Sequence, residues 1–162
     1  MPRIFATSLS AMLVGLMMTT AISAPAAFAA DTVVSKEAPD LTAVRAKIKA
    51  RDYPGAIADL TKIAETVQHA DVYNLLGFSL RKSKDYKSAY TYYRKALEYD
   101  AAHKGAHEYL GELYVETGDM PKAKEMLAKL AVLCPKGCEE REDLDKAIRE
   151  ASAKPKSAPK VN

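Results

Sequence analysis

The sequence predicts an all-α protein made of helix–turn–helix units that stack in a row. Segments 70–103 and 104–137 align with each other without a gap, at a spacing of 34 residues. Apolar residues recur in both segments at intervals of three and four, which is the period of an amphipathic helix. A repeat of this length with two helices per unit indicates a solenoid, in which neighbouring units bury each other's apolar faces.

Composition narrows the class of protein. The chain of 162 residues has 24 Lys and Arg against 21 Asp and Glu, so its formal net charge is only +3. Nucleic-acid proteins usually have a strong basic excess, and we therefore expect no nucleic-acid partner. With 28% charged residues and two Cys, the chain matches neither a polytopic membrane protein nor a disulfide-rich mini-protein.

Residues 1–29 have the pattern of a secretory signal peptide. Arg3 is followed by a long uncharged stretch, and Ala27-Phe28-Ala29 provides the small–x–small motif that signal peptidase cuts. The uncharged stretch is also long enough to span a membrane, so an uncleaved anchor is the alternative. We expect cleavage, no stable membrane insertion afterwards, and localisation in a bacterial periplasm.

The remaining elements follow in order. Residues 30–37 are expected to form a flexible arm, and 38–69 a degenerate first unit with a helix near 39–50. In that unit Asp52-Tyr53-Pro54-Gly55-Ala56 repeats the pattern of Asp85-Tyr86-Lys87-Ser88-Ala89. Residues 139–153 are predicted to form a capping helix with an acidic first turn, which suits the helix dipole. Residues 154–162 are expected to be a disordered tail.

Packing positions are predicted from the two full units. Small residues such as Gly77 and Gly111 are expected where two helices cross closely, because a larger side chain would separate them. The residues expected to pack between helices are Tyr73, Leu76, Gly77, Leu80, Ala89, Tyr93 and Ala96 in segment 70–103, and Leu110, Gly111, Tyr114, Ala123, Leu127 and Pro135 in segment 104–137.

These motifs resemble the tetratricopeptide repeat (TPR) family over roughly residues 38–153. The family pattern is an aromatic residue, then x2-Leu-Gly-x2-Tyr, then Ala-x3-Phe, then Pro. Segment 70–103 has Tyr73-x2-Leu76-Gly77 and Ala89-x3-Tyr93, with Ala101 in the slot where the family has Pro. Segment 104–137 has His107-x2-Leu110-Gly111-x2-Tyr114 and Ala123-x3-Leu127, so His and Leu replace two aromatic residues.

The resemblance implies that the first helix of each unit lines a concave face that binds peptides. The groove candidates are Asn74, Phe78, Arg81 and Lys82 in one unit, and Glu108, Glu112, Val115 and Glu116 in the next. We interpret them as a groove with a basic end and an acidic end that orients a partner segment. An ordinary solvated helix face is the alternative. The three Glu residues contradict the Lys, Arg and Asn clamp by which the family binds acidic C-terminal peptides.

Cys134 and Cys138 enclose Pro-Lys-Gly between the last unit and the capping helix. In an oxidising compartment we expect a disulfide that fastens the cap, provided that the geometry allows the bond. Free or redox-active thiols are one alternative, and a copper site is another, because paired thiolates suit Cu(I). His103 and His107 are four residues apart, but we expect His107 in an aromatic core slot rather than on a metal.

No catalytic motif and no phosphate-binding loop occurs in the sequence, so we predict no enzymatic activity and no cofactor. The hypothesis is a non-enzymatic periplasmic TPR protein that binds a protein or peptide in its concave groove, as an adaptor or assembly scaffold in the cell envelope. The alternative hypothesis is a thiol-redox or copper-handling accessory protein that uses Cys134 and Cys138.

Overall fold

A computed structural model describes residues 38–153, and within them the chain forms helices and no β-strand. The predicted signal peptide, arm and tail (1–29, 30–37 and 154–162) lie outside the described residues. The helices are α1 (Thr42–Lys49), α2 (Tyr53–Ala64), α3 (Ala70–Lys82), α4 (Tyr86–Tyr99), α5 (Lys104–Thr117), α6 (Met120–Leu133) and α7 (Glu139–Ala153).

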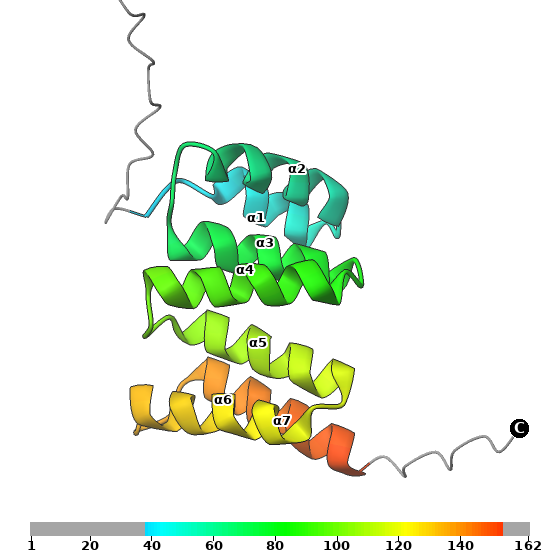
Figure 1. The fold of residues 1–162 in the computed structure, drawn as a ribbon, viewed down its shortest axis with the longest axis vertical. Helices are drawn as coiled ribbons and strands as arrows, with labels where there is room; N and C mark the ends of the chain where they lie inside the picture. The colour runs from blue at the N-terminus through cyan, green and yellow to red at the C-terminus, as the bar shows by residue number, and fades with distance from the viewer. Residues whose placement is uncertain (1–37, 154–162) are drawn as a thin grey trace, which may run out of the picture.

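The helices stack in the order of the sequence, from α1 and α2 at one end to α6 and α7 at the other (Figure 1). Helices α1–α2, α3–α4 and α5–α6 form three antiparallel pairs, and each pair packs on the next through α2 on α3 and α4 on α5. Helix α7 packs on both α5 and α6. The predicted all-α solenoid is therefore confirmed. None of these helices is long and apolar enough to cross a membrane.

The turn inside each helix pair has the same backbone structure. One residue at each turn has a positive φ: Arg51 (61°), Lys84 (68°) and Gly118 (83°). The N–H group of the following Asp donates to a carbonyl five residues earlier: Asp52 to Lys47 (2.9 Å), Asp85 to Leu80 (3.0 Å) and Asp119 to Tyr114 (2.8 Å). A left-handed residue followed by this hydrogen bond is the Schellman motif, which satisfies the last carbonyls of a helix.

The same three Asp residues begin the second helix of each pair. Their side chains accept hydrogen bonds from the N–H groups of Gly55 (3.0 Å), Ser88 (3.1 Å) and Lys122 (3.3 Å). Such N-caps satisfy donors that have no partner inside the helix. The first pair therefore has the complete turn of a repeat, although the sequence of its first helix shows no Leu-Gly motif.

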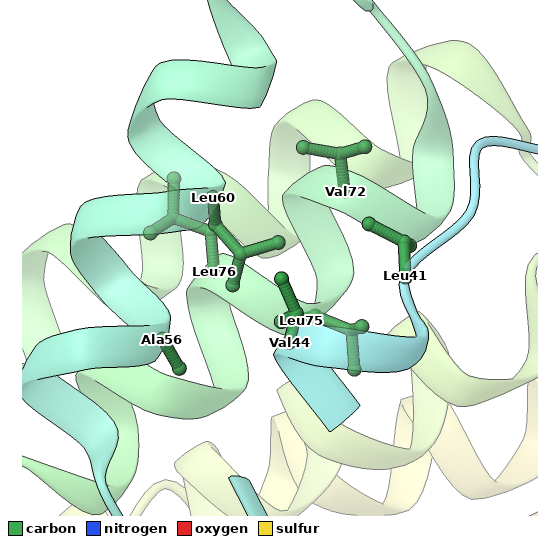
Figure 2. Close-up of a cluster of buried hydrophobic side chains, with 7 residues drawn as sticks. All are labelled: Leu41, Val44, Ala56, Leu60, Val72, Leu75 and Leu76. Carbon is green, nitrogen blue, oxygen red and sulfur yellow. The ribbon is translucent and has the colours of Figure 1, made fainter. Parts of the chain in front are cut away.

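The apolar core runs from unit to unit. Figure 2 shows the cluster that joins α1, α2 and α3: Leu41, Val44, Ala56, Leu60, Val72, Leu75 and Leu76. Further clusters join α4 to α5 through Tyr93 and Leu110, and α6 to α7 through Leu130 and Leu144. Each pair of helices is thus stabilised by its neighbours, as expected of a repeat array.

The predicted packing residues are mostly buried. A Cβ on Gly77 would lie 2.7 Å from Cδ1 of Tyr93, and one on Gly111 would lie 2.4 Å from Cδ2 of Leu144, so both helix crossings require glycine. The expectation for Pro135 was wrong: this residue is exposed, because it lies in the loop between α6 and α7. Leu80, Tyr114 and Leu127 are only half-buried.

Candidate functional site

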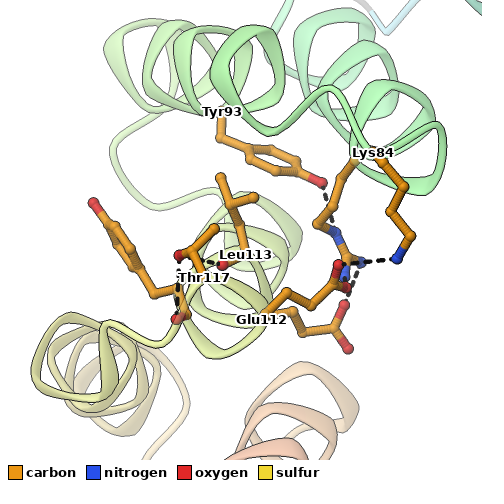
Figure 3. Close-up of polar contacts among 8 residues, drawn as sticks. Lys84, Tyr93, Glu112, Leu113 and Thr117 are labelled. Carbon is orange, nitrogen blue, oxygen red and sulfur yellow. Dashed lines mark hydrogen bonds and ion pairs between the residues drawn. The ribbon is translucent and has the colours of Figure 1, made fainter. Parts of the chain in front are cut away.

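Arg81 on α3 lies at the centre of a buried polar network. Its side chain is only 1% exposed, and its guanidinium forms ion pairs with Glu116 (2.5 Å from Nη1) and with Glu112. Its Nε donates to the hydroxyl of Tyr93 at 3.3 Å. Figure 3 shows Tyr93, Lys84 and Glu112 converging on this network. Burial alone would lower the pKa of Arg81, but Tyr93 and the two carboxylates raise it, so the residue stays charged.

This network corrects the predicted groove. The basic and acidic ends are not separate, because Arg81 and two of the three Glu residues neutralise each other across the α3–α5 boundary. A buried guanidinium requires such partners, since an unpaired buried charge is very costly. Lys82 is exposed, and its ammonium lies 5.2 Å from the centre of the Phe78 ring.

Two other groove candidates contribute to packing. Phe78 belongs to an aromatic row, with its ring centre 4.9 Å from that of Tyr109 and 6.5 Å from that of Tyr53. Val115 packs against the apolar cluster of α6 and α7, so it faces the core and not a groove. Of the eight candidates, Asn74 and Glu108 are the two that line a cleft.

That cleft has a volume of about 310 Å³ and lies between the first helices of successive units. Helices α1, α3, α5 and α7 each contribute to its wall. This agrees with the expectation that the first helix of each unit lines the binding face. Its lining residues are Arg45, Asp71, Asn74, Leu75, His103, Gly105, Glu108, Tyr109, Glu139, Glu140 and Asp143. We call it the acidic cleft, because five of these residues have carboxylates.

The positive groups at the acidic cleft neutralise only part of this charge. His103 caps α5, with Nδ1 accepting from the N–H of Ala106 at 3.0 Å, so Nε2 can donate to Asp71 at 3.1 Å. Among residues 38–153, no Lys, Arg or His nitrogen lies within 4.0 Å of the carboxylates of Glu108, Glu139, Glu140 or Asp143. Arg45 is the one Arg or Lys on the described wall.

Glu108 is the most enclosed of these acids. It is 7% exposed, and no hydrogen bond to its carboxylate occurs within the described part of the chain. Burial, together with the nearby charges of Glu112, Asp143 and Glu140, raises the pKa of Glu108 to about 8, and Arg81 opposes this only weakly. The carboxyl group therefore holds a proton at neutral pH when nothing else approaches it.

Asn74 also lines the acidic cleft, and it is 5% exposed. Its Oδ1 is buried and has no hydrogen-bond partner in residues 38–153. A buried acceptor without a partner costs about 1–3 kcal/mol, so an unpartnered one is uncommon. Gly105 leaves room at this point, since a Cβ there would lie 3.2 Å from Nδ2 of Asn74.

Sequence reasoning missed most of the acidic wall. Glu139, Glu140 and Asp143 were assigned only to the dipole of the capping helix, and Asp71 and Tyr109 were not candidates. The signal was present in the repeat itself: if α7 is the first helix of a further unit, its first turn lies beside the first turn of α5. Sequence reasoning does identify Glu108, but as part of the acidic end of a groove rather than as an enclosed acid.

Cys134 and Cys138 are joined by a disulfide, with their Cα atoms 6.0 Å apart. Cys134 is buried at the end of α6, and Cys138 directly precedes α7, so the bond links the last pair to the capping helix. In this form neither sulfur is the thiolate that a Cu(I) site requires. Within residues 38–153, no three His, Cys, Asp or Glu side chains are arranged to hold a metal ion.

Both the sequence and the fold are similar to those of known proteins. Residues 80–132 match the sequence profile of a family described as tetratricopeptide repeat. No curated protein matches the chain significantly.

Among solved structures, the chain is similar to the first TPR of Spaghetti (RPAP3) bound to the HSP90 peptide SRMEEVD, with 16% identity, a TM-score of 0.60, and coverage of 69% of this chain and 90% of that one. The second TPR domain of human RPAP3, in complex with the HSP70 peptide SGPTIEEVD, has 18% identity and a TM-score of 0.60, with 70% and 92% covered. MamA has 20% identity and a TM-score of 0.56, with 69% and 74% covered. Residues 80–132 thus match the tetratricopeptide repeat profile, and the paired helices of the described residues have the fold of a tetratricopeptide repeat array.

Proposed function

We propose that this protein is a non-enzymatic adaptor or assembly scaffold of the bacterial cell envelope, which binds a segment of a partner protein in the acidic cleft. The observation that supports it best is the cleft itself, because the first helices of all three pairs and the capping helix contribute to one recess. A recess built across repeats recognises a segment of chain rather than a single small molecule.

The similar structures support binding of this kind. Two of them are complexes of TPR domains with short peptides. Those peptides end in Glu-Glu-Val-Asp and are acidic, whereas the cleft of this protein is itself lined by acidic side chains. The proposal therefore takes from them the mode of binding, a peptide held on a helical array, and not the ligand.

The location in the periplasm is proposed from the sequence. The features of residues 1–29 and the disulfide between Cys134 and Cys138 both suit an exported protein in an oxidising compartment. Fractionation of cells that express the full chain, followed by immunoblotting, tests this part: the protein is expected in the periplasmic fraction. Recovery with the cytoplasmic fraction would contradict it.

Partner binding is tested by cross-linking in envelope extract with a matched pair of variants. Asp143→Lys reverses a charge at the acidic cleft, and Glu150→Lys makes the same kind of change at an exposed position of α7 outside it. A specific partner is expected with the wild-type chain and with Glu150→Lys, and is expected to be lost with Asp143→Lys. Equal recovery with both variants would refute binding in the cleft.

A further inference from the structure

The acidic cleft has acidic side chains that the protein leaves without a cationic partner. Glu108, Glu139, Glu140 and Asp143 have no cationic nitrogen within 4.0 Å in the described part of the chain. This differs from the neighbouring network, in which Arg81 is paired with two carboxylates. The same fold thus neutralises one group of acids internally and leaves the other open to the cleft.

The helix dipole explains part of this cluster. Glu139 and Glu140 occupy the first turn of α7, where a carboxylate is stabilised by the partial positive charge of the helix end. It does not explain Glu108, which lies in the second turn of α5 and is 7% exposed. A cationic ligand in the cleft would give this carboxyl group a partner, which the dipole of α7 does not.

Asn74 gives a second, independent indication of a ligand in the acidic cleft. Asn74 lines the acidic cleft, and its buried Oδ1 has no hydrogen-bond partner among residues 38–153. Glu108 and the other acidic side chains of the wall are oxygen acceptors, so a matching ligand must bring N–H donors and positive charge. A metal ion is a poor match, because the described residues offer no group of three suitable ligands.

We propose that the acidic cleft is the receptor for a basic side chain, the ammonium of Lys or the guanidinium of Arg, in an extended segment of the partner. This inference rests on the proposed function, since it names the chemistry of the segment that the cleft binds. The volume of about 310 Å³ is large enough to hold a long side chain. Charge complementarity decides the class of partner, because the wall has five acidic side chains and one Arg.

The proposal also predicts that Glu108 loses a proton when the basic side chain binds. Glu108 has a pKa of about 8 when the cleft is empty, so a cation that pairs with it displaces a proton. Binding is therefore expected to tighten between pH 6.5 and pH 8.5, over which the ionised fraction of Glu108 rises about tenfold or more. The charged groups that face Glu108 are Glu112 on its own helix, Arg81 and Asp71 on α3, Arg45 on α1, His103 at the start of α5, and Glu140 and Asp143 on α7.

The test uses the full chain and two fluorescent nonapeptides, one of alternating Ala and Lys and one with Glu in place of each Lys. Fluorescence anisotropy is expected to give at least tenfold tighter binding of the Lys peptide, with an affinity that rises with pH. Glu108→Gln is expected to weaken binding at least tenfold and to remove most of the pH dependence, whereas Glu150→Gln on the outer face of α7 leaves both unchanged. Equal loss in the two variants, or none in Glu108→Gln, would overturn the proposal, as would spermidine binding as tightly as the peptide.

The Lys peptide also separates this inference from the proposed function when it is added as a competitor in the cross-linking experiment. If the partner is lost with Asp143→Lys but is not displaced by the Lys peptide, the function stands and the basic ligand is wrong. If the Lys peptide binds through Glu108 but no partner depends on the cleft, the ligand chemistry stands and the adaptor function is wrong. Displacement of the partner by the Lys peptide alone, and not by the Glu peptide, supports both.

Discussion

Replacing Glu108 by Gln is expected to make the protein more stable, and increasingly so as the pH rises. The folded chain raises the pKa of Glu108 from 4.5 to about 8. A carboxyl whose pKa is raised by folding contributes stability that is complete below pH 4.5 and is lost as the pH rises through 8. Gln has nearly the same shape and cannot ionise, so the variant escapes this loss.

The magnitude follows from the two pKa values. One pKa unit corresponds to about 1.4 kcal/mol, so the free energy of unfolding lost by the wild-type chain between pH 5 and pH 8 through this one group is about 2–4 kcal/mol. The stability advantage of Glu108→Gln over the wild type should grow by that amount across the same range. Other titrating groups affect both proteins similarly and largely cancel in the comparison.

Urea denaturation followed by circular dichroism measures this difference. The wild type, Glu108→Gln and Glu150→Gln are unfolded at pH 5, 6, 7 and 8, and each free energy is obtained by linear extrapolation. Glu150 is exposed at the far end of α7, so its substitution should change stability by the same small amount at every pH. If the advantage of Glu108→Gln does not grow between pH 5 and pH 8, the reasoning about its enclosure is refuted.

Three further substitutions test the packing and the turns by the same denaturation assay. Arg81→Ala should lower the free energy of unfolding by about 3 kcal/mol or more, because it leaves two carboxylates and a buried Tyr hydroxyl without their partner. A loss below about 1 kcal/mol would show that this network contributes little to stability. Gly77→Ala should lower the free energy of unfolding by about 1–2 kcal/mol despite the better helix propensity of Ala, because its Cβ would lie 2.7 Å from the ring of Tyr93. An unchanged free energy would mean that the ring can move aside. Arg51→Gly should add about 0.5 kcal/mol, because φ is 61° and only Gly adopts that conformation without strain, and destabilisation would contradict the left-handed turn.

The fold was predictable because the residues that define it interact over short sequence distances. Gly77 and Tyr93 meet within one helix pair, and their spacing recurs in the next pair, so the repeat can be recognised without the structure. The degenerate first pair was harder, since its first helix lacks the Leu-Gly motif. Its Asp52 nevertheless ends one helix and begins the next as Asp85 and Asp119 do, and that turn is the part of the repeat it preserves.

The site was less predictable because it depends on contacts between units. Arg81 is 31 residues from Glu112 and 35 from Glu116, and no local pattern shows that the three side chains meet. Helical spacing correctly placed Glu108 on the first helix of its unit, but the degree of enclosure depends on how α7 covers α5. Asn74 was a candidate for its position alone, and only the structure shows that its Oδ1 lacks a donor.

The disulfide between Cys134 and Cys138 has a consequence for the acidic cleft as well as for the capping helix. Helix α7 begins at the residue after Cys138 and immediately provides Glu139 and Glu140 to the cleft wall. The start of α7 is thus anchored covalently, and the rest of the helix packs on α5 and α6 through Leu144 and Ile148. The same covalent bond that fastens the capping helix therefore also fixes where two of the acidic side chains of the cleft begin, relative to the end of α6.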